Sequence, residues 1–160
     1  MGSFRNDAGK EYEGPEAILG MAGIYNLRLL RDVHVDISAY QEFIEGAFGQ
    51  DEAAWDAASP AVVEGAGGVQ GGWGSGRLAV LAHSDGDSLV DLGQRGAMAQ
   101  SLASWVDGRL HGKTRWIEKL SIKGEHDEAW EKGDELAGAI AFTVARLHTV
   151  DSSANDSNQP

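Results

Sequence analysis

The stretch RLAVLAHSDGDSLVD, residues 77–91, places the tightest constraint on what this chain can fold into. Leu78 to Ala82 form a short continuous apolar run, which is typical of a strand buried on both faces. The run ends abruptly in His-Ser-Asp-Gly-Asp, and apolar residues resume only at Leu89. A buried strand that ends in carboxylates, a glycine and a hydroxyl indicates a functional loop at its carboxyl end.

Strand and helix patterns alternate along the rest of the chain. We expect two further strands in AILGMAGI and RWIEKLSI, and a flexible connection over residues 64–76. Apolar residues at helical spacing predict helices in SAYQEFIEGAFG, with Ser38 as N-cap, in DEAAWDAASP, over residues 91–107, and in a long amphipathic segment spanning residues 136–147.

This alternation predicts an α/β fold with a parallel sheet and helical crossovers. Only three strands are visible, so we expect an incomplete sheet, part of a larger domain, over residues 15–149. Residues 1–14 are expected to form a flexible arm, and the polar residues 150–160 a disordered tail.

Composition excludes several classes of function. The formal net charge of −12 argues against binding nucleic acid through phosphate neutralisation. No apolar stretch reaches the roughly 18 to 20 residues that a membrane span needs, so no membrane partner is expected. The chain contains no cysteine, which excludes disulfides and thiolate metal sites and fits a cytoplasmic location.

Residues able to do acid–base chemistry follow two of the expected strands. In open α/β sheets, ligands and catalytic groups gather at the carboxyl ends of the strands. An acid after one strand and a histidine after the next is the order of the last two triad members in α/β-hydrolases. We predict Asp87 as the acid, because Asp-x-x-Val anchors Val90 beneath it, whereas Asp85 shapes the turn. We predict His126 as the base, since it follows Gly124 in the loop before a helix.

The other histidines show no spacing typical of a metal site, and we interpret them as structural or solvated; they are His34, His83, His111 and His148. His83 closes the strand and is expected to orient the following loop by hydrogen bonding. No metal site is therefore predicted.

The third triad member has no counterpart in the sequence. The serine nucleophile of this class lies in Gly-x-Ser-x-Gly on a strand-to-helix turn. Ser75 has glycines directly beside it and precedes a strand, and Ser88 has Gly86 on one side but Val90 on the other. The glycine-rich residues 64–76 also contain no Gly-x-Gly-x-x-Gly, so they do not predict dinucleotide binding.

Four segments of the chain together carry a resemblance to a known family; they are AGIYNLRLLRDVH, ISAYQEFIEGAFGQDEAAWDAASPA, GRLAVLAHSDGDSLVDLGQRGAM and GEHDEAW. From about Ala17 to Leu147 the chain thereby resembles the C-terminal half of fungal kynurenine formamidase (arylformamidase), an α/β-hydrolase. Gly-Ala-Phe-Gly-x-Asp-Glu-x-x-Trp-x-x-x-Ser-Pro and Asp-Ser-Leu-Val-Asp-x-x-Gln are the specific parts of the match.

The resemblance implies hydrolysis of N-formyl-L-kynurenine to L-kynurenine and formate, a step of tryptophan catabolism in the kynurenine pathway that feeds NAD biosynthesis, without a cofactor. It implies that Asp87 is the triad acid and His126 the triad base. It also implies that Tyr40, Phe43 and Phe48 belong to a segment over the active-site mouth, where they could contact an aromatic substrate; the alternative is that these side chains simply pack onto the sheet. Because the family's nucleophile elbow and His-Gly-Gly oxyanion motif have no counterpart, we expect a truncated form that is inactive by itself.

Two alternatives stay open at this point. The chain could be a non-catalytic α/β remnant that binds a small molecule or a partner through an unpaired sheet edge. It could also be part of a related esterase-like α/β-hydrolase with another substrate. The sequence leaves a homodimer open as well.

Overall fold

The structure is a computed structural model, and it describes residues 14–107 and 114–156 of the chain. The expected flexible arm lies, except for Gly14, outside the described residues. Three parallel strands form one sheet in the order β1 (Ala17–Met21), β2 (Leu78–Ser84), β3 (Trp116–Ile122). All seven residues of β2 are buried, as the apolar run predicted. The predicted α/β fold with a partial parallel sheet is therefore confirmed.

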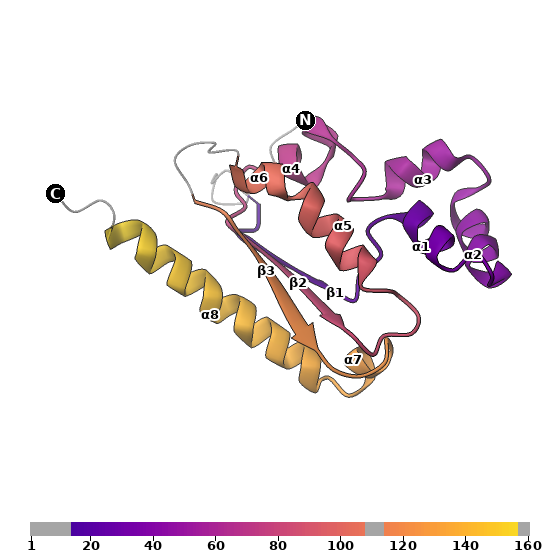
Figure 1. Ribbon diagram of the computed structural model, residues 1–160. Coiled ribbons are helices and arrows are strands. Elements are labelled where there is room, and N and C mark those ends of the chain that lie inside the picture. The colour runs from indigo at the N-terminus through magenta and orange to yellow at the C-terminus, as the bar shows by residue number, and fades with distance from the viewer. Residues whose placement is uncertain (1–13, 108–113, 157–160) are drawn as a thin grey trace, which may run out of the picture.

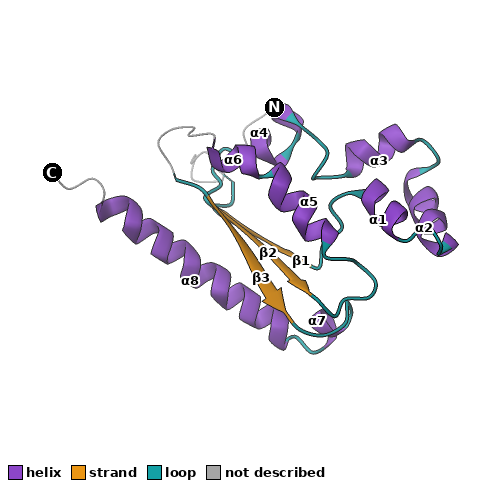
Figure 2. Ribbon diagram, in the orientation of Figure 1, coloured by secondary structure: helices purple, strands orange, loops and turns teal. Residues whose placement is uncertain are grey.

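Helices connect the strands and cover both faces of the sheet (Figures 1 and 2). Between β1 and β2 lie α1 (Leu27–Val33), α2 (Ser38–Phe48), α3 (Glu52–Ala58), the 3₁₀ turn η1 (Gly65–Gly67) and α4 (Val69–Gly72). Between β2 and β3 lie α5 (Gly93–Ser101) and α6 (Ala103–Asp107), and after β3 come α7 (Glu128–Glu131) and α8 (Asp134–Asp156).

The two faces of β2 pack against different helices. On one face, Leu81 lies in a cluster with Met98 and Leu102 from the α5–α6 segment. On the other face, Ala82 packs in a cluster with Ala139 of α8. Because side chains alternate along a strand, neighbouring residues of β2 serve opposite layers, which explains why this strand is apolar throughout.

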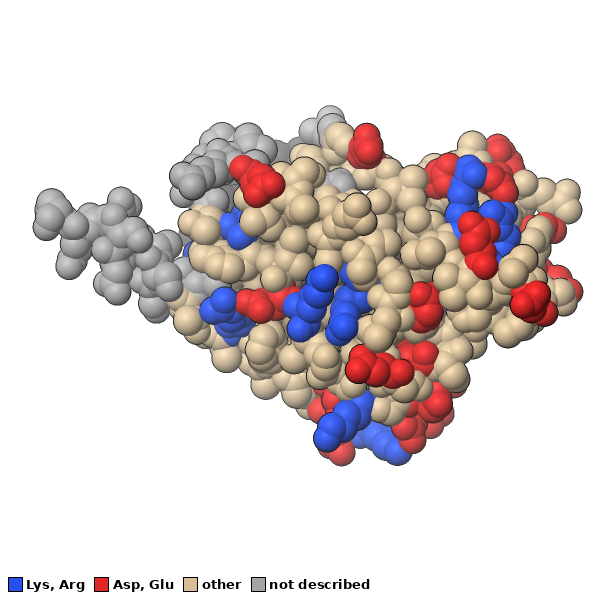
Figure 3. Space-filling model, in the orientation of Figure 1, with Lys and Arg blue, Asp and Glu red and all other residues tan. Residues whose placement is uncertain are grey.

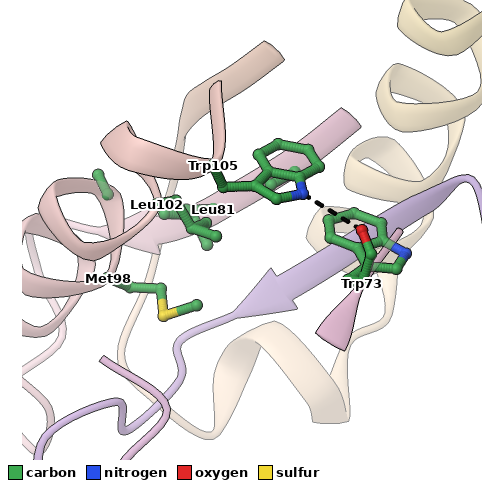
Figure 4. Packing of buried hydrophobic residues seen from close by; sticks show 7 residues of the cluster. Trp73, Leu81, Met98, Leu102 and Trp105 are labelled. Atoms are coloured by element: carbon green, nitrogen blue, oxygen red, sulfur yellow. Dashed lines mark hydrogen bonds between the residues drawn. The ribbon is translucent and has the colours of Figure 1, made fainter. Parts of the chain in front are cut away.

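The glycine-rich segment is more ordered than the sequence predicted. In place of a flexible connection over residues 64–76, it contains η1 and α4 and leads to the buried Trp73. The Trp73 ring stacks on Trp105 with centroids 4.8 Å apart, and Trp105 Nε1 donates to the Trp73 carbonyl at 3.3 Å (Figure 4). Burial of the two indoles offsets the entropy lost by the glycines around them.

Several helix ends also differ from the sequence prediction. Ser38 is the first residue of α2 and Ile37 takes the cap position without a side-chain hydrogen bond, so the predicted Ser38 N-cap is wrong. The helix expected over residues 91–107 is divided at Leu102. Helix α8 continues to Asp156, so residues 150–156 are helical where a disordered tail was expected; no Gly or Pro interrupts that stretch.

Helices α1 to α3 form a small lobe with a core of its own. Leu27, Leu30, Ile44 and Trp55 are buried together in this lobe. An ionic network joins α1 to α3 on its surface, where basic and acidic side chains lie side by side (Figure 3). Among the described residues, no helix combines the length and the apolar character that crossing a membrane requires.

Candidate active site

The loop after β2 is a tight turn that begins at Ser84. Ser84 Oγ accepts a hydrogen bond from Gly86 N at 3.0 Å, and the Ser84 carbonyl accepts one from Asp87 N at 3.3 Å. The turn was expected to be shaped by Asp85, but these bonds come from Ser84. Gly86 lies close to the loop after β3, because a Cβ at this position would stand 3.5 Å from the Gly124 carbonyl oxygen. The two strand-end loops are therefore neighbours.

The Asp87 carboxylate lies inside this loop with only 1% of its side chain exposed. Its Oδ1 accepts hydrogen bonds from Leu89 N at 3.0 Å and from Val90 N at 2.9 Å. Val90 itself is buried. The Asp-x-x-Val spacing thus has the structural effect that the sequence predicted: the carboxylate closes the turn and anchors the buried valine.

His126 lies opposite Asp87, in the loop that joins β3 to α7. Its Nδ1 is 2.9 Å from Asp87 Oδ2, and 21% of its side chain is exposed. A carboxylate can only accept, so Nδ1 is the donor and Nε2 is left with a lone pair. The structure therefore brings together the two residues that the sequence singled out, and the lone pair on His126 Nε2 is able to accept a proton.

A second contact holds the two loops in register. Glu125 Oε2 accepts hydrogen bonds from Ser88 N at 3.0 Å and from Ser88 Oγ at 2.8 Å. Ser88 and Glu125 are the direct neighbours of Asp87 and His126 in the chain. This pairing therefore limits how far the carboxylate and the imidazole can move apart.

Two of the remaining histidines, His83 and His34, make structural contacts. His83 Nε2 lies 2.7 Å from the Val90 carbonyl oxygen, which confirms the predicted hydrogen bond from this histidine to the loop. His34 lies beside the Leu30 carbonyl oxygen and stacks on Tyr40, whereas His111 lies outside the described residues. Within residues 14–107 and 114–156, no group of three or more His, Asp or Glu side chains could hold a metal ion.

A cavity of about 320 Å³ lies between α2 and the two loops. Its lining is mainly apolar and comprises Ile24, Leu30, Ala39, Tyr40, Phe43, Leu89, Val90 and His126. Two of the three aromatic residues expected at an active-site mouth, Tyr40 and Phe43, therefore line this cavity together with the histidine. Phe48 is exposed and does not belong to the lining.

Tyr40 also fastens α2 to the loop after β2. Its hydroxyl donates to the Leu89 carbonyl at 2.7 Å, and its ring stacks on His34 with centroids 3.9 Å apart. Burial, with the nearby charges of Asp87 and Asp91, raises the pKa of the Tyr40 hydroxyl, so it remains protonated and able to donate. Helix α2, which lines the cavity, is thus hydrogen-bonded directly to the loop that carries Asp87.

Gln94, the last residue of the Asp-Ser-Leu-Val-Asp-x-x-Gln motif, has a structural role that the sequence did not indicate. This side chain is fully buried; its Oε1 accepts from Tyr25 N at 2.9 Å and from Asn26 N at 2.8 Å, while its Nε2 donates to the Asn26 carbonyl at 3.0 Å. Asn26 caps α1, since its Oδ1 accepts from Leu29 N. Gln94 therefore positions the start of the α1–α3 lobe against α5.

Known proteins are similar in sequence to this chain over most of its length. The kynurenine formamidase-like hydrolase fscH of Fusarium equiseti is 34% identical over 144 residues, which cover 90% of this chain and 46% of the relative. The kynurenine formamidase avaC of Aspergillus versicolor is 36% identical across 76% of this chain and 46% of its own length. The chain is a homologue of fungal kynurenine formamidase-like hydrolases. This confirms the resemblance seen in the sequence.

The homology has a defined extent. The chain spans about half the length of the curated kynurenine formamidase-like relatives it matches. No family model and no solved structure matches the chain.

Proposed function

We propose that the protein contributes the acid and the base of a serine hydrolase that converts N-formyl-L-kynurenine and water to L-kynurenine and formate. The observation that carries this proposal is the 2.9 Å hydrogen bond between the buried Asp87 carboxylate and the partly exposed His126 ring at the edge of an apolar cavity. The names of the two fungal relatives supply the substrate.

His126 moves the protons in the proposed reaction. Its Nε2 takes the proton of a serine hydroxyl as the serine oxygen attacks the formyl carbon, and a tetrahedral intermediate forms. The imidazolium then returns this proton to the aniline nitrogen of kynurenine as the C–N bond breaks. In the second half-reaction, His126 Nε2 takes a proton from water, which hydrolyses the formyl-serine ester to formate. The imidazolium then returns this proton to the serine oxygen and regenerates the serine.

Asp87 keeps His126 in the tautomer that this cycle needs. Because Asp87 Oδ2 accepts from Nδ1, the lone pair stays on Nε2. The carboxylate also stabilises the imidazolium that forms in each half-reaction. Its other oxygen is occupied by the Leu89 and Val90 amides, so the carboxylate cannot rotate without losing two backbone hydrogen bonds.

We further propose that the serine lies outside these 160 residues, which contain no Gly-x-Ser-x-Gly. In the described part of the chain, β1 pairs only with β2, so its other edge is open to a further parallel strand. The carboxyl ends of parallel strands meet at one edge of a sheet, and the turn after such a strand would reach the side on which Asp87 and His126 lie.

The cavity suits the aromatic part of the substrate. At about 320 Å³, it is at the lower end of the range of pockets that enclose small molecules. Phe43 and Tyr40 offer ring surfaces from α2, and His126 borders the same space. A substrate whose aryl ring lies between these side chains would present its formamide to His126.

The test is turnover by the product of the longest open reading frame that contains these residues. We expect this product to release kynurenine, followed by its absorbance, and to hydrolyse phenyl acetate less efficiently. The variant His126→Ala is expected to lose activity by a factor on the order of 10⁴ to 10⁶, whereas His148→Ala, on the exposed surface of α8, should retain it. Ester hydrolysis without formamide hydrolysis would instead favour a related esterase.

A further inference from the structure

We propose that His83 is a positioning residue, which fixes the Asp87 carboxylate toward His126 by holding the backbone of Val90. The importance of this role for catalysis rests on the proposed function, but the geometry that supports it does not. His83 is the sixth residue of β2 and is fully buried, so its position is set by the central strand of the sheet.

The contacts of His83, Asp87 and Val90 form a closed ring. His83 Nε2 lies 2.7 Å from the Val90 carbonyl oxygen, and Val90 N donates to Asp87 Oδ1 at 2.9 Å. The ring closes where Asp87 Oδ2 lies 3.5 Å from His83 Nε2. Val90 is thus held at both of its backbone polar groups, once by the histidine and once by the acid.

The partners of His83 determine its tautomer. A carbonyl oxygen can only accept, so Nε2 carries the hydrogen that faces Val90. Nδ1 is buried and has no hydrogen-bond partner in the described part of the chain, so a hydrogen placed there would be left without an acceptor. The N–H edge of the ring therefore points to the side on which the Asp87 carboxylate lies.

The His83 N–H lies beside a carboxylate that is shielded from water. The Asp87 side chain is 1% exposed, and a charge in such a place depends on nearby donors for its stabilisation. Among the described residues, His126 Nδ1 donates to Asp87 Oδ2 at 2.9 Å, and His83 Nε2 lies 3.5 Å from the same oxygen. Removing the His83 donor would leave the Val90 carbonyl without this partner and would let the loop relax, turning the carboxylate from His126.

Two substitutions separate this role from simple packing. His83→Gln places an amide nitrogen at nearly the reach of Nε2 and can still donate to Val90, whereas His83→Met has a similar length but no donor. Met98→Ala is the matched control, because Met98 is buried in the cluster on the α5 face and makes none of the polar contacts that join His83, Val90 and Asp87. Met98→Ala should lower the stability of the fold without altering the hydrogen bond between Asp87 and His126.

The measurement is the ring N–H proton of His126 in the 160-residue chain, labelled with ¹⁵N-histidine and assigned by its loss in His126→Ala. We expect the hydrogen-bonded Nδ1–H resonance to persist in His83→Gln and Met98→Ala and to be lost or strongly shifted in His83→Met. An unchanged resonance in His83→Met would overturn the proposal, as would equal loss in Met98→Ala.

If His83→Met fails to fold, His83→Gln still tests whether residue 83 acts as a hydrogen-bond donor. Loss of the resonance in a folded His83→Gln chain would contradict the donor role. Since the readout needs no substrate, it is independent of whether the longer product hydrolyses N-formyl-L-kynurenine. Failure of the positioning role and failure of the proposed function are thereby distinguished.

Discussion

Replacing Asp87 by asparagine or by alanine separates the two tasks of one carboxylate. Asparagine keeps an oxygen where Oδ1 accepts from Leu89 and Val90, but it puts an uncharged amide against His126. Alanine removes every one of these contacts. The first variant should therefore preserve the loop and alter the histidine, whereas the second should damage both.

The expected free-energy changes follow from the contacts. In Asp87→Asn, a charge-assisted hydrogen bond to His126 becomes a neutral one, so we expect a loss of about 1–2 kcal/mol. In Asp87→Ala, the charge-assisted bond worth about 1.5–3 kcal/mol is lost and the partly buried Val90 N–H is unpaired at about 1–3 kcal/mol. Together these give about 2.5–6 kcal/mol, a large share of the roughly 5–15 kcal/mol by which domains are typically stable.

Urea unfolding of the 160-residue chain, followed by tryptophan fluorescence, measures both values. We expect Asp87→Ala to unfold at a clearly lower urea concentration than Asp87→Asn, with the same dependence of the unfolding free energy on urea. Equal stabilities for the two variants would refute the reasoning, because the backbone contacts of Oδ1 would then contribute nothing. In the active product, Asp87→Asn should lower kcat about 10⁴-fold through the wrong histidine tautomer, as in other triad enzymes.

Three further predictions concern other parts of the molecule. Burial raises the pKa of Tyr25 from 10.0 to about 12, so the unfolded chain releases this proton first, and stability should fall as the pH rises from about 10 toward about 12; Tm measured against pH should fall less in Tyr25→Phe, and an equal fall would contradict this origin. Ala39→Trp should fill part of the cavity and raise KM for formylkynurenine, whereas Glu42→Trp, at an exposed position of the same helix, should not; equal KM values would place the substrate elsewhere. Glu52 pairs with Arg28 and Arg31, but these side chains are partly exposed, so Glu52→Gln should lower the urea midpoint only slightly, and less at high salt; a large, salt-independent loss of stability would refute a surface ion pair.

Sequence reasoning succeeded where one strong physical constraint acted alone. The apolar run of β2 favoured a strand buried on both faces because it is short and stops abruptly, and its polar ending marked the loop that carries Asp87. The pairing with His126 followed from the rule that carboxyl ends of parallel strands share one edge of the sheet. Both inferences needed only the order of residues along the chain.

Features that depend on tertiary packing could not be read in this way. Helix α1 has only seven residues, and its side chains Leu27 and Leu30 are buried against α2 and α3 rather than against the sheet. The order of the glycine-rich segment depends on Trp73 meeting Trp105 about thirty residues later. Gln94 carried one usable signal, a polar residue on the same helix face as the buried Met98, but its partners just before α1 are 68 and 69 residues away.

Labelling with a fluorophosphonate tests most directly whether Asp87 and His126 activate a serine. Applied to the product of the longest open reading frame, the probe should modify a single serine outside the 160 residues, and the labelling should disappear in His126→Ala and persist in His148→Ala. A labelled serine within these residues, or labelling that survives the loss of His126, would contradict the account.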